Sequence, residues 1–336
     1  MHQVVTNARA TDPFLHSERS VRTVVTRNAD ELARNLTDWE QTYDQMTSGN
    51  FQGLLTEWRT PGLQIFREEI SQAVRQSCTV WDGALWFGFP DCEHVVSGDA
   101  AFTDGTRING RPMEQGCVMV RPGGSMFELL TPSRHAIYGM VVGRSTLERA
   151  AQLGGFDIDV DRLGGAELLR VDTAARARCM DVIGAALSAL CVGDTVAPRH
   201  YEDALLSALL TLLDCSEVEP AAARSFQRRQ RVVARVHELI LAQRDQAVTV
   251  AELCAQAHVS RRTLQYCFED VLGMSPNTYL RRVRLNGARR QLLDPQARHQ
   301  PIGMVAADWG FGSFSQFSSD YRSLFGECPS ASRLAN

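Results

Sequence analysis

Residues 250–272 read VAELCAQAHVSRRTLQYCFEDVL. The apolar residues before His258 recur at helical spacing, His258-Val259 interrupts them, and Ser260 suits the N-cap of a second helix. On that second helix four apolar side chains fall at i, i+4, i+7 and i+8 and must share one buried face. They are Leu264, Phe268, Val271 and Leu272. The stretch therefore predicts two short helices joined by a tight turn.

The opposite face of the second helix is polar and basic. It carries Arg261, Arg262, Gln265 and Tyr266. In the major groove of DNA, arginine can bind guanine and glutamine can bind adenine through two hydrogen bonds, while hydroxyl groups bind phosphates. A merely solvated helix face is the alternative. We favour base contacts because the same pattern occurs a second time.

The second copy is IGMVAADWGFGSFSQFSSDYRSLF, residues 302–325. Gly310-Phe311-Gly312 makes the turn, Ser313 suits the N-cap, and Phe317, Tyr321, Leu324 and Phe325 repeat the buried spacing. The candidate DNA contacts on its outer face are Ser315, Gln316, Ser319 and Arg322. This face has fewer arginines, so we expect it to discriminate less strongly between bases or to rely on DNA shape.

Ser275-Pro276 begins a longer helix between the two copies, with serine at the N-cap and proline at N1. About 18 residues at about 1.5 Å each span about 27 Å. Such a rod can hold two recognition helices near the ~34 Å repeat of successive major grooves. Arg281 and Arg282 are candidate phosphate contacts. Internal ion pairs or solvation are equally open for them, as for Arg284, Arg289 and Arg290.

Charge divides the 336-residue chain in the same place as the pattern. Residues 1–220 carry 19 Arg against 30 Asp and Glu, a net of −11, whereas residues 221–336 carry 16 against 9, a net of +7. A basic C-terminal third on an acidic body indicates a polyanionic partner for that third. The predicted domains are 1–215 for sensing and dimerisation, 216–226 as linker, and 227–336 for DNA binding.

Composition excludes several other classes of protein. All 35 basic residues are arginine, so the chain has no lysine for a phosphate-binding loop, a Schiff base or a Ser-Lys dyad. Nine cysteines without a C-x-x-C pair fit reduced thiols better than disulfides or a zinc site. Because no apolar run approaches the length of a membrane span or a signal peptide, we expect a cytoplasmic protein.

The N-terminal part shows short apolar or alternating runs separated by turn residues, which predict β-strands. These runs are Leu63 to Ile70, Ala84 to Phe89, Cys117 to Arg121, Ser125 to Leu130 and Ala136 to Val142. Two helical patterns follow, at residues 172–191 and 200–214. The predicted fold is therefore α+β. A small antiparallel β-barrel of cupin-like form, or a sandwich, carries helices and is followed by an all-α domain.

The second of these helices is apolar over a wide arc. The arc consists of Leu205, Leu206, Leu209, Leu210 and Leu213. Such an arc can form a homodimer contact, and burial within one subunit is the equal alternative.

The C-terminal residues resemble the AraC/XylS family of transcription regulators. The resemblance rests on His258-Val259-Ser260-Arg261-Arg262-Thr263-Leu264, Phe268, Leu272-Gly273, Pro276, Asp320-Tyr321-Arg322, Leu324-Phe325-Gly326 and Pro329-Ser330. It implies a seven-helix domain with two helix-turn-helix units, double-stranded promoter DNA and RNA polymerase as partners, and activation of catabolic genes.

The N-terminal part resembles the ethanolamine-responsive members of this family. The matching residues include Trp39, Tyr43-Asp44-Gln45, Phe66-Arg67-Glu68, Arg75-Gln76-Ser77-Cys78, Trp86-Phe87-Gly88 and Phe127-Glu128-Leu129. The implied effectors are ethanolamine and adenosylcobalamin. Other members of the family sense other amines, amino acids or aromatic acids, and these remain alternatives.

An ethanolammonium ion would favour a carboxylate beside an aromatic face. Glu68 and Glu128 stand beside Phe66 and Phe127, with further tryptophans on neighbouring predicted strands. The candidate effector-binding residues are Trp58, Phe66, Glu68, Trp86 and Glu128. Surface exposure of either glutamate, and aromatic residues that only fill a core, are the alternatives.

Two other classes of protein are alternatives to an effector-responsive regulator. A cupin-type metal enzyme fused to a DNA-binding tail needs two histidines two residues apart, with a third histidine and a carboxylate. Histidines 2, 16, 94, 135 and 200 include no such pair, so we expect neither an enzyme nor a catalytic cofactor. A constitutive DNA-binding protein with a purely structural N-terminal domain remains possible.

Overall fold

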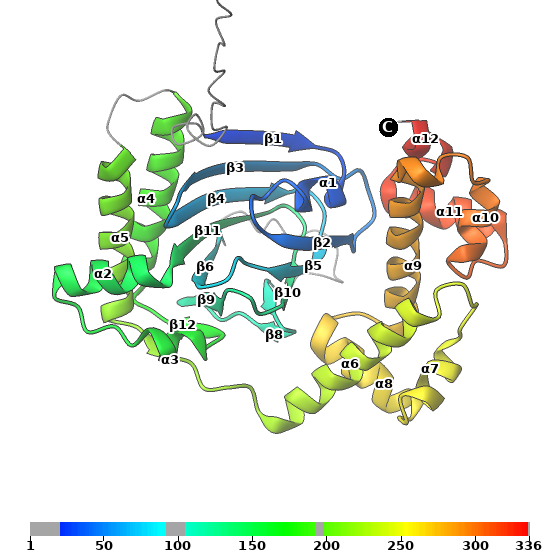
Figure 1. Cartoon of the computed structure of the whole chain (residues 1–336). Helices are drawn as coiled ribbons and strands as arrows, with labels where there is room; N and C mark the ends of the chain where they lie inside the picture. Colours follow the sequence, from blue (N-terminus) through cyan, green and yellow to red (C-terminus); the bar gives the residue numbers. More distant parts are fainter. Residues whose placement is uncertain (1–20, 92–104, 193–197, 335–336) are drawn as a thin grey trace, which may run out of the picture.

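The computed structural model describes residues 21–91, 105–192 and 198–334. Histidines 2, 16 and 94 lie outside these ranges. The N-terminal part contains two antiparallel sheets (Figure 1). The eight-stranded sheet has the order β1 (Arg22–Thr26), β3 (Gly53–Thr60), β4 (Leu63–Ile70), β11 (His135–Gly143), β6 (Ala84–Asp91), β9 (Cys117–Pro122), β12 (Leu168–Arg170) and β13 (Glu217–Val218). The five-stranded sheet has the order β2 (Glu40–Gln45), β5 (Val74–Thr79), β10 (Phe127–Thr131), β7 (Arg107–Ile108) and β8 (Arg111–Pro112).

Among the residues that the structure describes neither sheet closes, so the predicted barrel is not supported and the two sheets form a sandwich. In the described part of the chain β1 and β13 are the free edges of one sheet, and β2 and β8 are those of the other. Alternation with period two determines which side chains point inward, but it does not determine which edges pair. The five strands predicted from the sequence are confirmed to within two residues. The strands before residue 50 were not predicted.

An apolar core between the sheets holds them together. It includes Phe66, Trp86 and Phe127, which are all buried. Gly139 on β11 lies opposite Phe66 on β4. A Cβ atom there would stand 2.1 Å from the Phe66 ring, so only glycine leaves room for that ring.

Helices cover the outer face of the eight-stranded sheet (Figure 1). They are α2 (Arg144–Gly154), α3 (Val160–Gly164), α4 (Thr173–Cys191) and α5 (Pro198–Asp214); α1 (Ala29–Ala33) packs beside β2. On α5 four leucines of the apolar arc are buried in this core, namely Leu205, Leu209, Leu210 and Leu213, and Leu206 is partly buried. Burial within one subunit is therefore correct for these four, and they cannot form a dimer contact. Dimerisation itself stays a prediction.

The C-terminal part is helical, as predicted. Its helices are α6 (Arg224–Ala242), α7 (Val250–Gln256), α8 (Arg261–Leu272), α9 (Pro276–Leu293), α10 (Ile302–Asp308), α11 (Phe314–Phe325) and α12 (Pro329–Leu334). The unit α7–α8 lies at the lower end of the rod α9, and the unit α10–α11 lies beside the rod (Figure 1). Within the predicted linker, residues 217–218 form β13 and α6 begins at Arg224.

The predicted caps and turns are confirmed. The side chains of Ser260, Ser275 and Ser313 accept hydrogen bonds from the backbone N–H groups of residues 263, 278 and 316. His258 has a φ of 54°, the left-handed conformation that lets the chain turn sharply between α7 and α8. At Gly310, with a φ of 72°, a Cβ atom would lie 2.5 Å from the carbonyl oxygen of Gln246, so glycine is required there.

Candidate nucleic-acid interface

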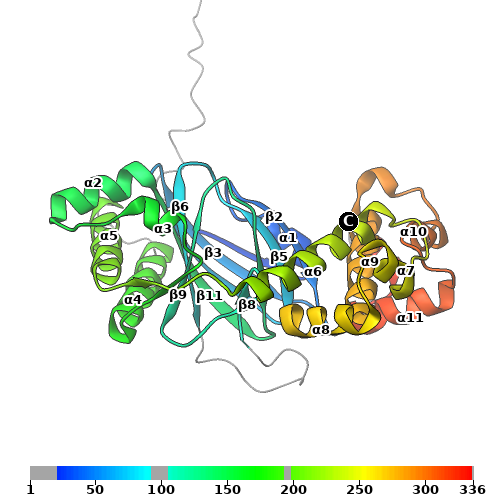
Figure 2. The same ribbon diagram turned by 90° about the horizontal axis from the view of Figure 1, so that it is seen from below.

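The first recognition helix, α8, presents the side chains that the sequence assigned to DNA. Arg261 and Arg262 occupy its first turn and are exposed, as is Tyr266. The opposite face is buried against α6 and α9. Figure 2 shows α8 and α11 on the same side of the C-terminal domain. The two recognition helices can therefore approach one face of a duplex together.

Two outward residues of α8 are held by neighbours. Gln265 is half-buried, and its Nε2 donates to Oε1 of Glu269 at 2.5 Å. The Arg229 guanidinium lies 5.4 Å from the centre of the Tyr266 ring, and its Nε donates to Asp270 at 2.7 Å. Helix α6 thus fixes the Tyr266 ring through a cation–π contact that sequence reasoning did not anticipate.

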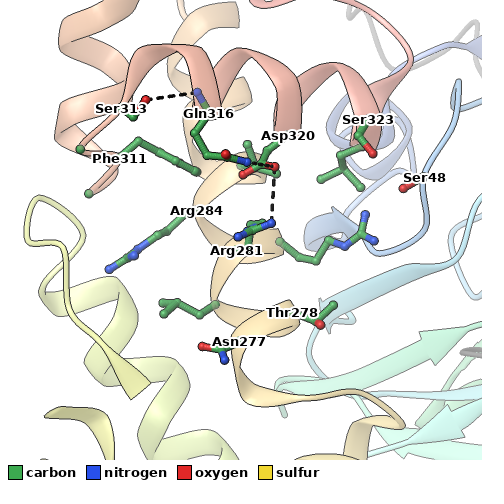
Figure 3. Close-up of a pocket in the computed structure, with 16 residues that line it drawn as sticks. Ser48, Asn277, Thr278, Arg281, Arg284, Phe311, Ser313, Gln316, Asp320 and Ser323 are labelled. Atoms are coloured by element: carbon green, nitrogen blue, oxygen red, sulfur yellow. Dashed lines mark hydrogen bonds and ion pairs between the residues drawn. The ribbon is translucent and has the colours of Figure 1, made fainter. Parts of the chain in front are cut away.

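The second recognition helix, α11, exposes Ser315, Gln316, Ser319 and Arg322. Nε2 of Gln316 donates to Oδ1 of Asp320 at 2.8 Å, and the Arg281 guanidinium approaches the same oxygen at 3.4 Å (Figure 3). Phe314 at the start of α11 is also exposed and was not predicted as a contact.

A groove of about 670 Å³ separates α9 from α11, as Figure 3 shows. Arg281, Arg282 and Arg284 line it together with Asp320 and Ser48. The Arg281 side chain is 59% exposed, and Arg282 is half-buried. Both predicted phosphate contacts on the rod therefore border the groove between α9 and the second recognition helix.

The remaining arginines of the rod are engaged within the protein. Arg284 donates to the carbonyls of Gln246 and Val248, and its burial lowers the pKa of its guanidinium. Arg289 pairs with Glu327 at 2.8 Å. Arg290 pairs with Asp30 and Asp44 at 3.1 and 2.9 Å. For these three the alternative of internal pairing is correct.

The five candidate effector residues do not lie together. Trp58 belongs to the core under α4 and α5. Phe66, Glu68 and Trp86 lie on strands β4 and β6 and belong to the space between the sheets, since Phe66 and Trp86 are in that core and Glu68 shares the face of Phe66. Glu128 pairs with Arg75 on the outer face of the five-stranded sheet. A β-strand sends neighbours to opposite faces, so Glu128 cannot join Phe127 between the sheets.

Glu68 is a buried acid, 3% exposed. It accepts hydrogen bonds from the Tyr43 hydroxyl at 2.8 Å and from Nε2 of Gln76 at 3.1 Å. Desolvation outweighs these two hydrogen bonds and raises the pKa of Glu68 to about 7. The sequence placed Tyr43 and Gln76 in the N-terminal resemblance but did not indicate that they contact Glu68.

Aromatic rings pack together between the sheets, and one of them, Phe66, lies on the same face of β4 as Glu68. Trp86 stacks on Phe127 with ring centres 4.9 Å apart, and Trp39 meets Phe66, Trp86 and Phe127 edge-on at 5.6–6.3 Å. The indole nitrogen of Trp86 is buried and has no hydrogen-bond partner among the residues that the structure describes.

Residues 253–335 match the model of a family described as a helix-turn-helix domain. The chain is 31% identical over 132 residues to a XylDLEGF operon transcriptional activator of Pseudomonas putida, an alignment that covers 39% of this chain and 40% of the relative. It is 40% identical over 83 residues to the regulatory protein HrpB of Ralstonia nicotianae, covering 25% of this chain and 17% of that protein. A solved structure of a probable AraC family transcriptional regulator from Rhodopseudomonas palustris is 32% identical. That match covers 31% of this chain and 96% of the structure, with a TM-score of 0.28.

Residues 253–335 form a helix-turn-helix domain, and the chain is similar in sequence to these transcription regulators. The family resemblance seen in the sequence is confirmed for this part of the chain. The chain spans about two fifths of the length of the Pseudomonas relative, and the matched region is C-terminal. The ethanolamine-responsive resemblance of the N-terminal part stays a prediction.

The AraC-type domain and the sandwich show neither a metal site nor a membrane span where they are described. No group of three or more His, Cys, Asp and Glu side chains in residues 21–91, 105–192 and 198–334 could hold a metal ion. None of the helices in those ranges combines the length and apolar character that a membrane span requires. The relatives named above are a transcription activator and regulatory proteins, not enzymes.

Proposed function

We propose that this protein is a sequence-specific, DNA-binding transcription regulator that activates catabolic genes together with RNA polymerase. The observation that carries the proposal is the shared side on which α8 and α11 stand, with the rod α9 between them (Figure 2). Arg261 and Arg262 on one helix and Gln316 and Arg322 on the other are exposed donors for base edges and phosphates. The net charge of +7 in residues 221–336 favours the same partner.

The test is selection of bound sequences from a random duplex pool by the full chain, followed by affinity measurements on the selected site. Arg262→Ala should weaken that site by about 1–3 kcal/mol and bind unrelated duplexes nearly as well as before. Arg235→Ala removes an exposed arginine of α6 and should change affinity by less than about 0.5 kcal/mol. Equal binding of every duplex by the wild-type chain would contradict the proposal.

We further propose that the effector is a small amine, with ethanolamine as the first candidate, bound between the sheets beside Glu68. A buried carboxyl group on the same face of β4 as the Phe66 ring supports a cation, since the carboxylate supplies the charge and the ring supplies a π face. An aromatic acid would need a cationic partner, and Phe66, Glu68 and Trp86 provide none. Binding would shift the population of DNA-competent states by its differential affinity for them.

Thermal unfolding of the full chain tests this effector. Ethanolamine should raise the melting temperature, whereas ethylene glycol, which replaces the ammonium by a hydroxyl, should not. Glu68→Gln should remove the response without changing effector-free DNA binding. With effector present, DNA affinity or promoter output should change about 5- to 150-fold. If ethanolamine alters none of these quantities, the amine assignment is wrong and the DNA-binding proposal is untouched.

Adenosylcobalamin is proposed as a second effector on the resemblance alone. The rings of Trp39, Phe66, Trp86 and Phe127 pack against one another between the sheets at centre separations of 4.9–6.3 Å. A corrin does not fit among them.

Homodimer formation likewise remains a proposal.

A further inference from the structure

Both recognition helices contain the same local device, a glutamine followed one turn later by an acid. On α8, Nε2 of Gln265 donates to Oε1 of Glu269 at 2.5 Å. On α11, Nε2 of Gln316 donates to Oδ1 of Asp320 at 2.8 Å. The two glutamines are not equivalent when the helices are aligned on their buried faces. The device therefore occurs independently in each helix.

The acid determines which way the amide turns. An ionised carboxylate only accepts hydrogen bonds, so the amide nitrogen of the glutamine must face it. The opposite orientation would place Oε1 of the glutamine against a carboxylate oxygen. With one N–H committed, the amide still has Oε1 as an acceptor and a second N–H as a donor. Adenine offers the complement in the major groove, its N6 amino group and its N7 acceptor.

Asp320 also lies where its negative charge is electrostatically unfavourable for DNA binding. It is the one acidic side chain among the described residues that line the α9–α11 groove, and three arginines line the same groove. Its side chain is 12% exposed and lies between Gln316 and Arg281 (Figure 3). A negative charge there weakens attraction to phosphates. A role in discrimination between bases accounts for a charge that affinity alone would disfavour.

We propose that Glu269 and Asp320 are positioning residues that hold Gln265 and Gln316 ready to contact adenine, so that each recognition helix selects an A·T pair. This inference rests on the proposed DNA binding. The acids touch the glutamines and not the bases. Asp320 additionally ties α11 to the rod through Arg281, which keeps Gln316 at a constant place relative to the first recognition helix.

The experiment selects bound sequences from a random duplex pool with the full chain and its variants. Wild-type protein should select an adenine at one pair that Gln316→Ala no longer selects. In Asp320→Asn an amide replaces the carboxylate. Because an amide can both donate and accept a hydrogen bond, it can pair with the Gln316 amide in either orientation. Preference for that adenine should fall at least about 5-fold, while affinity for unrelated duplexes rises because one negative charge is lost. Gln316→Ala with Asp320→Asn should show no further loss of preference. Glu269→Gln should relax a different pair, the one that Gln265→Ala relaxes.

Glu238→Gln is the matched control, since it removes one exposed negative charge from α6, outside both recognition helices. It should leave the selected sequence unchanged. Circular dichroism of each variant shows whether it is folded, and a misfolded Asp320 variant leaves Glu269→Gln to decide. An unchanged adenine preference in a folded Asp320→Asn or Glu269→Gln protein would overturn the inference, even if affinity for all DNA increases. If the wild-type chain selects no sequence, the proposed function itself fails.

Discussion

Glu68 shows how burial changes the chemistry of one side chain. Its neighbour Arg67 points to the opposite face of β4, over the ring of Tyr138 at 5.3 Å, whereas Glu68 points between the sheets. The alternation of a strand therefore places one charge outside and one acid inside. The inward acid has a pKa of about 7 because desolvation disfavours its ionised form.

The raised pKa predicts a pH dependence of stability. The folded state binds the Glu68 proton more tightly than the unfolded chain, whose glutamate has a pKa near 4.5. The free energy of unfolding should therefore fall as pH rises from about 4.5 to about 7, by about 3 kcal/mol from this residue. Chemical denaturation at several pH values measures it. Glu68→Gln, which imitates the neutral acid, should lack this decrease.

Two histidines, His135, which is buried, and His237, which is half-buried, act in the opposite direction and must be separated from Glu68. Desolvation lowers the pKa of His135 and of His237 to about 4, so each destabilises the fold as pH falls from about 6.5 towards 4. Both are present in wild type and in Glu68→Gln. The difference between the two proteins thus isolates Glu68, and a difference that does not change with pH would contradict the prediction.

At the scale of elements, strand β2 and helix α9 meet through one buried amide. Oδ1 of Asn286 accepts from the backbone N–H of Gln45 at 2.9 Å, and its Nδ2 donates to the Gln45 carbonyl at 3.0 Å. β2 is an edge strand, so these backbone groups have no strand partner on that side. Asn286 therefore makes the hydrogen bonds to the edge backbone that a neighbouring strand would otherwise make. The ion pairs of Arg290 with Asp30 and Asp44 reinforce the same contact.

Asn286→Ala should destabilise the protein by about 2–4 kcal/mol, because it leaves a buried backbone donor and acceptor without partners. Denaturant unfolding of the full chain measures the loss. Asn277→Ala is the control, because Asn277 lies on the same helix but is exposed. It should cost less than about 0.5 kcal/mol. Similar losses for the two variants would show that the amide does not connect β2 to α9.

At the scale of the whole molecule, the sandwich contacts both helix-turn-helix units. Arg107 donates to the carbonyl of Asp270 at 2.8 Å, and a Cβ atom on Gly110 would lie 2.4 Å from Val271 of α8. At the other unit, Nε2 of Gln45 donates to the carbonyl of Leu324 on α11 at 2.8 Å. The N-terminal domain thus helps to set the spacing of the recognition helices.

The arginines of the rod differ in exposure, which predicts the salt dependence of binding. The Arg281 side chain is 59% exposed, whereas that of Arg289 is 10% exposed. Arg281→Ala should reduce the slope of log affinity against log salt concentration by about 1, because it removes one phosphate contact. Arg289→Ala should leave that slope unchanged and lower the melting temperature, because Arg289 is paired with Glu327 inside the protein. Titrations of the full chain at several salt concentrations measure the slopes. An equal reduction for both arginines would contradict the assignment.

The amino-acid sequence by itself determined the helix-turn-helix units, with their Ser260, Ser275 and Ser313 caps, and five strands of the sandwich, β4, β6, β9, β10 and β11. These features depend on neighbours within about four residues, so their signals are periodic and local. The exposed positions of Arg261, Arg262 and Gln316 followed from the same periodicity. These residues lie on the side of each helix that is opposite its buried face.

Only the tertiary structure decided which polar groups find partners far along the chain. Asn286 meets Gln45 across 241 residues, Arg290 meets Asp44 across 246, and Glu68 meets Tyr43 across 25. Such pairs depend on how the sheets and helices pack, and no local period encodes that packing. For the same reason the sequence could not place Trp58 and Glu128 apart from Glu68, or show that the sheets stay open. Those outcomes depend on edges and faces that become neighbours only after folding.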